Sequence, residues 1–347
     1  MGSHSKPQFA RISVIAAVVM LCVTTLVGCT STVQGYPLPE GFAGTYRGQL
    51  GQEDLDNVLW RDHVRMLDPC GFINDAAIAT LGAPTYFGGA QAFAECQIVF
   101  RPSVTEKGIY KVVADLSSRS AEPANATVNG VPVNTQAGLG CLITVPYRER
   151  GFSYWVHSKE GPEGFGHELD ACDEGLDFVA AALPTLDTMP LRRDTTHGFN
   201  TPLANIDPCA ALDHLDIDYS RWQIFTGLVA STCEFRFDGE DESTQYGWTN
   251  TQKTLDMLFH AHVLDYPVIT IDGVRAVQSD SCSLDIYLGE PNPRVVDIDA
   301  DGPPTDDYWA FSDHWVDVVE LTARDDCPRL DDVASAIIAA YRAAPPA

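Results

Sequence analysis

Basic residues are scarce in this sequence, and several motifs that identify enzymes are missing. Its 347 residues include 22 Lys and Arg against 48 Asp and Glu, a formal net charge of −26 at pH 7. So acidic a surface repels phosphate backbones and anionic headgroups, which excludes direct nucleic-acid binding. The Gly-x-Ser-x-Gly elbow of hydrolases and the Gly-rich phosphate-binding loops are absent as well. We therefore expect a protein that binds a partner and is not an enzyme.

Apolar runs of the roughly 20 residues that a transmembrane helix needs are also absent. The longest apolar run, residues 12–27, follows Lys6 and Arg11 and leads into Leu26-Val27-Gly28-Cys29. Positive charge before a short apolar segment is typical of a secretory signal peptide. The last four residues resemble the bacterial lipobox, in which the cysteine is acylated, for example with palmitate, and becomes the new N-terminus.

The lipobox predicts where the protein lies. Residues 1–28 would be a lipoprotein signal peptide, Cys29 the lipidated residue, and residues 29–45 a short tether with Pro and Gly. The lipid anchor would hold the mature chain at the extracytoplasmic face of the cell membrane. Its net charge would be −28, from 20 basic and 48 acidic residues. An ordinary signal peptide, with Cys29 unmodified, is the alternative.

Cys-x-x-Cys pairs, which zinc sites usually contain, are missing too. Of the ten cysteines, Cys22 and Cys29 belong to the leader region, which leaves eight. An even number of cysteines in an exported chain predicts disulfides. The eight form two sets of four with similar spacing: Cys70, Cys96, Cys141 and Cys172, then Cys209, Cys233, Cys282 and Cys327.

The two sets belong to an internal repeat. Each opens with Asp-Pro-Cys, at residues 68–70 and 207–209, and each has a Trp-containing strand, which we align at Trp155 and Trp315. Such a repeat predicts two tandem copies of one domain. The first domain, the linker and the second domain would be residues 46–190, 191–203 and 204–347.

Each copy is predicted to contain a short helix, several strands and a closing helix. In the first copy we expect helices at residues 70–81 and 173–186, and strands at 93–101, 109–116 and 152–157. This order predicts an α+β fold, in which an antiparallel sheet has its helices packed on one face.

Four cysteines in each copy allow three pairings. We prefer the first with the second and the third with the fourth, because each bridge would then tie the start of a helix to a strand. The preferred bridges are Cys70–Cys96, Cys141–Cys172, Cys209–Cys233 and Cys282–Cys327. The crossed pairings stay open.

A lipobox followed by Asp-Pro-Cys at a helix start and by cysteine-containing strands resembles a family of actinobacterial cell-envelope lipoproteins of unknown function. The resemblance covers residues 46–344. It implies an envelope location and small disulfide-bonded α+β domains, and it supplies no catalytic residues. That family usually carries one such domain, so the tandem arrangement departs from its pattern.

A short acidic segment late in the chain suggests a metal ion. Asp297, Asp299 and Asp301 precede Gly302 and match the opening of a calcium-binding loop. A complete loop would place Glu at its twelfth position, where this chain has Tyr308. A solvated acidic loop is the preferred interpretation, so the sequence predicts no cofactor, and calcium is the alternative that it offers.

These features together predict a membrane-anchored envelope lipoprotein that acts as a non-catalytic binding or interaction module. Its partner would be an envelope protein or a small ligand, bound in the cleft between the copies. Two alternatives remain. One is a carrier of a lipid or another hydrophobic envelope molecule, and the other is an envelope hydrolase that uses carboxylates without a fixed local spacing.

Overall fold

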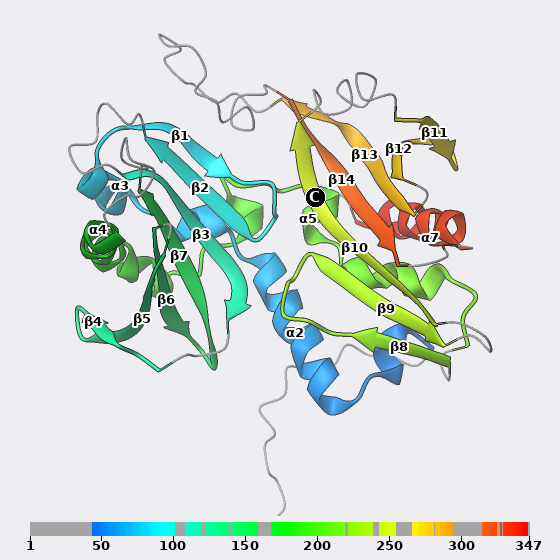
Figure 1. Ribbon diagram of the computed structural model, residues 1–347, viewed down its shortest axis with the longest axis horizontal. Coiled ribbons are helices and arrows are strands. Elements are labelled where there is room, and N and C mark those ends of the chain that lie inside the picture. The colour runs from blue at the N-terminus through cyan, green and yellow to red at the C-terminus, as the bar shows by residue number, and fades with distance from the viewer. Residues whose placement is uncertain are drawn as a thin grey trace, which may run out of the picture. The chain divides into compact units, whose positions relative to one another are not determined.

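The computed structural model contains two antiparallel β-sheets of seven strands each, together with α-helices and 3-10 helices (Figure 1). Both sheets belong to one compact unit that begins at Ala43. The structure describes residues 44–100, 109–119, 123–138, 140–158, 168–218, 221–238, 243–254, 266–280, 282–293, 314–324, 327 and 329–345. The predicted α+β class and the antiparallel pairing are confirmed.

The first sheet has the strand order β1-β2-β3-β7-β6-β5-β4. Its neighbouring strands all pair antiparallel. The strands are β1 (Pro84–Gly89), β2 (Glu95–Phe100), β3 (Ile109–Arg119), β4 (Ala126–Val128), β5 (Val131–Ala137), β6 (Cys141–Tyr147) and β7 (Arg150–Ser158).

The second sheet has the order β11-β12-β13-β14-β10-β9-β8. Read from β8, this is the order of the first sheet, so that β8 takes the place of β1 and β14 that of β7. The strands are β8 (Trp222–Phe225), β9 (Thr232–Asp238), β10 (Ser243–Thr254), β11 (Val268–Ile271), β12 (Val274–Asp280), β13 (Ser283–Pro293) and β14 (His314–Ala323).

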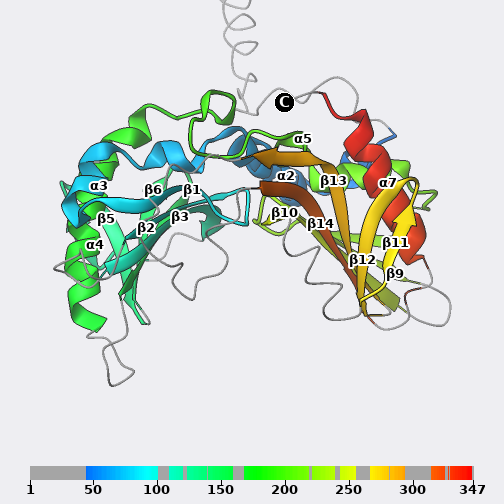
Figure 2. The same ribbon diagram turned by 90° about the horizontal axis from the view of Figure 1, so that it is seen from above.

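Helices pack on one face of each sheet. Helix α4 lies against β4 to β7 and against α3, whereas α7 lies against β11 and β13 (Figure 2). Within the described ranges, the opposite face of each sheet carries no helix. The α-helices are α2 (Gln52–Met66), α3 (Asp75–Leu81), α4 (Glu168–Ala182), α5 (Pro202–Asn205) and α7 (Leu330–Ala343). The 3-10 helices are η1 (Tyr46–Gln49), η2 (Pro69–Phe72), η3 (Leu183–Asp187), η4 (Arg192–Asp194) and η5 (Pro208–His214).

The two Asp-Pro-Cys motifs begin 3-10 helices. Asp68 accepts a hydrogen bond from the amide of Cys70 over 3.0 Å, and Asp207 accepts one from Cys209 over 3.1 Å. Proline follows each aspartate, where a missing N–H costs nothing and the fixed φ suits a helix start. The prediction of one helix over residues 70–81 is wrong, because η2 ends at Phe72 and α3 begins only at Asp75.

The disulfides follow the preferred pairing. The structure joins Cys70 to Cys96, Cys141 to Cys172, Cys209 to Cys233 and Cys282 to Cys327, with Cα–Cα distances of 5.0–5.5 Å. The bridges tie η2 to β2, β6 to α4, η5 to β9, and the start of β13 to the segment before α7. Three bridges therefore fasten a helix to its sheet, as predicted, and the fourth fastens the segment just before α7.

Helix α2 falls outside every helix that the sequence predicts, and it joins the two halves of the fold. Its residues Trp60 and Val64 pack in the core beneath the first sheet, whereas Val58 packs in the core beneath the second. A loop of each half likewise contributes a residue to the core of the other half. Phe93, between β1 and β2, belongs to the second core, and Ala230, between β8 and β9, belongs to the first. Each core is therefore completed by the other half.

Strand pairing places the two aligned tryptophans at different positions. The paired strands can be followed from Cys96 across the first sheet and from Cys233 across the second. In this comparison, Trp155 of the first sheet occupies the position of Thr322 in the second. The predicted alignment of Trp155 with Trp315 is therefore wrong. Trp315 is buried in the second core, whereas Trp155 is 43% exposed on the helix-free face of the first sheet.

The bridge between Cys209 and Cys233 offers a direct test of how disulfides stabilise the fold. Its loop spans a sequence separation of 24, and opening it should lower the free energy of unfolding by about 3 kcal/mol, because the unfolded chain regains loop entropy. Urea unfolding of the C209S/C233S variant against the oxidised wild type measures this loss. A peptide map that linked Cys209 to Cys282 or Cys327 would contradict the pairing itself.

Candidate functional site

Asp207 lies in a cluster of arginines where the two halves meet. Arg47 Nε donates to its Oδ2 over 3.1 Å, Arg65 Nη2 lies 3.9 Å from its Oδ1, and the Tyr46 hydroxyl donates to the same carboxylate. Burial acts to raise the pKa of Asp207, but the neighbouring arginines outweigh burial and hold that pKa below its usual range. The carboxylate is therefore ionised in the folded protein and fixes the position of η5 against α2.

Arg192 binds backbone carbonyl groups on both sides of this junction. The buried guanidinium donates to the carbonyls of Arg65, Phe199 and Phe93 over 2.7–2.9 Å. Arg65 in turn donates to the Ala230 carbonyl over 3.0 Å. Hydrogen bonds from a charged donor are stronger than neutral ones. These arginines therefore have a structural role, which is to hold the halves together.

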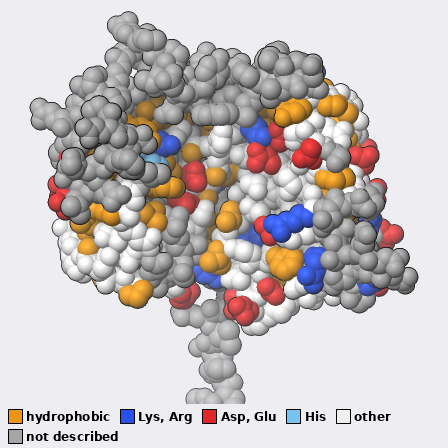
Figure 3. Space-filling view, in the orientation of Figure 1, with side chains coloured by type: hydrophobic (Ala, Val, Ile, Leu, Met, Phe, Trp, Pro, Cys, Tyr) orange, Lys and Arg blue, Asp and Glu red, His pale blue; other side chains and the backbone are white. Residues whose placement is uncertain are grey.

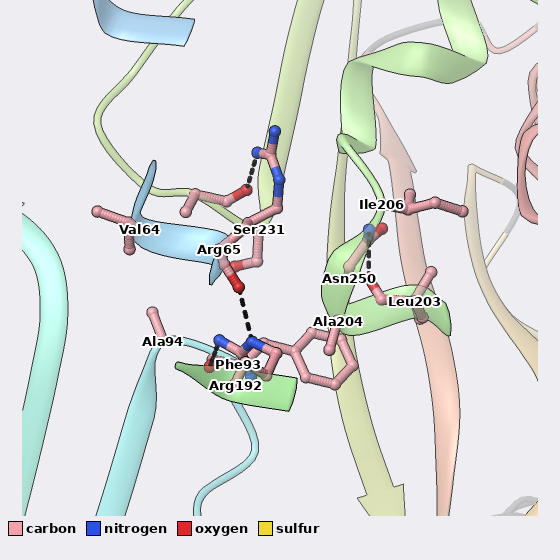
Figure 4. Close-up of a pocket in the computed structure, with 11 residues that line it drawn as sticks. Val64, Arg65, Phe93, Ala94, Arg192, Leu203, Ala204, Ile206, Ser231 and Asn250 are labelled. Atoms are coloured by element: carbon pink, nitrogen blue, oxygen red, sulfur yellow. Dashed lines mark hydrogen bonds between the residues drawn. The ribbon is translucent and has the colours of Figure 1, made fainter. Parts of the chain in front are cut away.

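The space that these arginines surround is very small. Figure 4 shows the lining side chains, among them Arg65, Arg192 and Asn250, around a cavity of about 10 Å³. That volume holds about one water molecule. The Ser231 hydroxyl lines the cavity and has no hydrogen-bond partner among the residues that the structure describes, which suits one bridging water. At this point the ligand cleft predicted between the copies is closed.

Two wider grooves lie at the surface. One, of about 460 Å³, runs between the start of α2 and the edge strand β8 and is lined in part by Trp222, Ile224 and Phe225. The other, of about 330 Å³, lies between α5, η5 and the end of α7. Either groove can admit a small molecule or a peptide side chain by volume. Volume alone does not indicate a ligand class.

The helix-free face of the first sheet carries an exposed aromatic side chain beside polar ones. Trp155, in the middle of β7, stacks on His157 with ring centroids 4.6 Å apart. Directly opposed residues of antiparallel strands share a face, so the next row on this face runs through Glu95, Asp115 and Ser153. Figure 3 shows acidic side chains beside hydrophobic ones on the viewer's side of the molecule, over this part of the fold.

Burial shifts the titration of two groups on this face. It raises the pKa of Glu95 to about 7, with the charge of Asp115 acting in the same direction and that of Lys111 against it. Burial, together with the charge of Lys111, lowers the pKa of His157 to about 4. At neutral pH His157 is therefore uncharged, and Glu95 keeps its proton to a higher pH than an exposed glutamate does. An aromatic surface next to buried hydrogen-bonding groups is typical of binding hot spots.

The same face of the second sheet holds a closed charge cluster. The Lys253 ammonium lies 2.7 Å from the Asp285 carboxylate and 2.6 Å from that of Glu320. Burial acts to lower the pKa of Lys253, but the two carboxylates raise it, so the lysine stays charged. Its side chain is only 10% exposed. The lysine and the two carboxylates neutralise one another, so this cluster has little unpaired charge with which to bind a ligand.

A buried carboxylate also lies on the core side of the second sheet. Asp317 accepts hydrogen bonds from the Thr201 hydroxyl over 2.9 Å, from the Leu203 amide over 3.4 Å and from the Gln252 amide nitrogen. Burial raises the pKa of Asp317 to about 7. The side chain joins β14 to α5, and its position in the core gives it no access to a ligand at the surface.

The site residues predicted from the sequence divide into two groups. The eight disulfide cysteines are structural, whereas Cys29, Asp297, Asp299 and Asp301 lie outside the described residues. Across the ranges that the structure describes, no group of three or more His, Cys, Asp or Glu is arranged to hold a metal ion. Over the same ranges, no helix is long and apolar enough to span a membrane.

The sequence pointed to Trp155 only as part of the repeat, and it did not point to the other residues of the first-sheet face. The signal that would have found them is the alternation along β7, where Ser153, Trp155 and His157 lie between apolar side chains and so share one face. Comparison with known proteins adds no further guide, because no protein-family model, curated protein or solved structure matches this chain.

Asp207→Ala should destabilise the protein by about 3–5 kcal/mol at pH 7, because Arg47, Arg61 and Arg65, whose charges all act on Asp207, would lose a buried counter-charge. Since the folded pKa of Asp207 is depressed, its contribution is present above the unfolded value of about 4 and is lost as the pH falls through the folded value. Urea unfolding at pH 7 and pH 3 measures both effects, and the cost should shrink at pH 3.

Asp68→Ala is the matched control, because Asp68 caps η2 in the same way but burial raises its pKa. Loss of a helix cap costs about 1–2 kcal/mol. Equal costs for the two substitutions would contradict a special role for the arginine cluster around Asp207.

Proposed function

We propose that this protein is a lipid-anchored lipoprotein of the cell envelope that binds a partner protein through the helix-free face of its first sheet. Trp155 carries the proposal, because it is a large aromatic side chain that remains 43% exposed in the middle of a strand. Tryptophan contributes more binding free energy at interfaces than most residue types. The lipobox ending at Cys29 supports the anchor.

We further propose that the two halves are tandem copies of one domain, at residues 46–190 and 204–347. Support comes from the identical strand orders, the equivalent placing of the disulfides and the two aspartate caps. The copies have diverged on their helix-free faces, since Lys253 forms ion pairs with the acidic side chains of the second sheet. In this proposal the first copy recognises the partner and the second supports it. The resemblance to actinobacterial envelope lipoproteins supports the envelope location and the disulfide-bonded α+β fold of each copy, but not their tandem arrangement.

A test of partner binding needs the lipidated protein in its own envelope. After mild cross-linking, purification and mass spectrometry, the wild type should retain a reproducible partner protein. Trp155→Ala should weaken partner binding by a factor of about 30, as expected when a contact worth about 2 kcal/mol is lost, and should therefore lower the recovery of the partner. Tyr266→Ala, which removes another exposed aromatic side chain, is the control. Equal recovery with Trp155→Ala would contradict the proposal.

A carrier of a hydrophobic envelope molecule is the second candidate. The groove of about 460 Å³ beside β8 favours it, since Leu50, Trp222 and Phe225 contribute apolar surface there. Native mass spectrometry of the purified lipoprotein would show a bound lipid in this case, and the cross-linked sample would contain no partner protein.

Calcium at Asp297, Asp299 and Asp301 remains a proposal from the sequence. If the segment binds calcium, 1 mM CaCl₂ at ~10 times the dissociation constant should stabilise the protein by about 1.4 kcal/mol. Thermal unfolding with calcium and with magnesium measures the effect. An unchanged melting temperature in calcium, or the same change in the triple Asp→Asn variant, would rule out the site.

A further inference from the structure

A groove follows the outermost strand of the second sheet. Strand β8 is the last in the order of the described strands, so among these strands one of its edges has no neighbour (Figure 1). All four residues of β8, and the two that follow it, line the groove of about 460 Å³. Successive side chains of a strand point to opposite faces, so a pocket on one face would be lined by alternate residues only. The groove therefore runs along the backbone edge of β8.

Strand pairing shows which main-chain groups reach this groove. The Ser231 carbonyl accepts a hydrogen bond from the Asn250 amide of β10, so the odd-numbered residues of β9 bond to β10 and the even-numbered ones bond to β8. Ile224 lies opposite Phe235, an odd-numbered residue. The N–H and C=O groups of Ile224 therefore point away from β9, toward the groove that this residue lines.

The edge of β8 is open to a further strand. Within the part of the chain that the structure describes, no backbone group outside the sheet bonds to Ile224 or Phe225. Proteins often protect an exposed edge with Lys, Pro or a β-bulge. The sequence of β8, Trp-Gln-Ile-Phe, contains neither residue type, and its pairing with β9 shows no bulge. Nothing in the strand itself therefore opposes pairing at this edge.

The equivalent edge in the first sheet is covered by the chain itself. Strand β1 has the place in the first sheet that β8 has in the second. The amide of Gly89, at the end of β1, donates to the His197 carbonyl over 3.0 Å, and the Phe87 ring stacks on His197 with centroids 4.3 Å apart. In the first half a peptide segment thus lies along this edge through a main-chain hydrogen bond and a side-chain contact.

The lining of the groove restricts the chemistry of a peptide at β8. Leu50, Ile224 and Phe225 contribute partly exposed apolar side chains. The described lining contains the carboxylate of Asp54 and no Lys or Arg. Asp54 accepts a hydrogen bond from the Thr226 hydroxyl, which holds the first turn of α2 against the end of β8. With a net charge of −26 on the whole chain, the groove favours a segment with apolar and basic residues.

We infer that the groove beside β8 binds an extended peptide segment of a partner protein, which pairs with β8 as an added strand of the second sheet. Main-chain hydrogen bonds to Ile224 supply affinity, and alternate apolar side chains of the segment lie against Leu50. A Lys or Arg beside them faces Asp54. The inference goes beyond the partner surface proposed at Trp155 and does not depend on it.

The test uses the acetylated and amidated peptide Lys-Val-Thr-Val-Lys as the probe for the intact protein. Hydrogen exchange followed by NMR should slow at the Ile224 amide in a saturable way, because the added strand removes this N–H from water. The same peptide with its three central amides N-methylated keeps its side chains but loses these donors. It should bind more weakly by a factor of about ten or more. The peptide Glu-Val-Thr-Val-Glu should also bind more weakly, because it repels Asp54.

A pair of variants separates the main chain of β8 from its side chains. Ile224→Pro removes the N–H that points to the groove without removing a bond to β9, and it should abolish binding of the probe. Ile224→Ala is the matched control, because it loses the same side chain and keeps the N–H. The N-methylated peptide tests the same hydrogen bonds on the wild type, whatever the effect of proline on folding.

The outcomes against the inference are distinct. Unchanged exchange at the Ile224 amide in about 5 mM probe, or equal binding of the N-methylated peptide, would overturn it. A wild-type dimer that Ile224→Pro dissociates in analytical ultracentrifugation would assign the edge to a second copy of the chain. A bound lipid that the probe fails to displace would assign the groove to the carrier function. Trp155→Ala should leave binding of the probe unchanged, and loss of binding in this variant would place the peptide on the first sheet instead.

Discussion

The ion cluster around Asp207 is the interaction on which the rest of the structure depends. It joins Arg47, at the beginning of the described chain, and Arg65 of α2 to the capping aspartate of the second Asp-Pro-Cys motif. A buried carboxylate is costly unless charges and hydrogen bonds compensate it. Because these partners come from segments far apart in the sequence, the cluster can form only when the two halves are in place.

The exchange of core residues follows from this constraint. With α2 held between the halves, Trp60 completes the first core and Val58 the second. The helix-free faces of the two sheets are left out of this packing, since the halves contact each other through their cores and connecting loops. This division explains why a chain with ample polar surface leaves Trp155 exposed on one sheet and shields Lys253 on the other.

Much of the local architecture was predictable. The even number and the spacing of the cysteines predicted disulfides and favoured the observed pairing, although a crossed pairing would also have joined helix starts to strands. Helix α2 could have been found from Leu55, Val58 and Leu59 with acidic residues in its first turn and basic ones in its last. The arginine cluster could not, since its contacts join residues about 160 positions apart. The first-sheet row likewise depends on strand register, which a sequence pattern does not fix.

The central claim is that the helix-free face of the first sheet, and not that of the second, meets a partner. A photo-activatable amino acid can be placed at position 155 or at the equivalent exposed position 322 of the full-length protein in living cells. The account predicts a protein adduct from position 155 and none from position 322. Adducts from position 322 alone, or equal adducts from both positions, would contradict it.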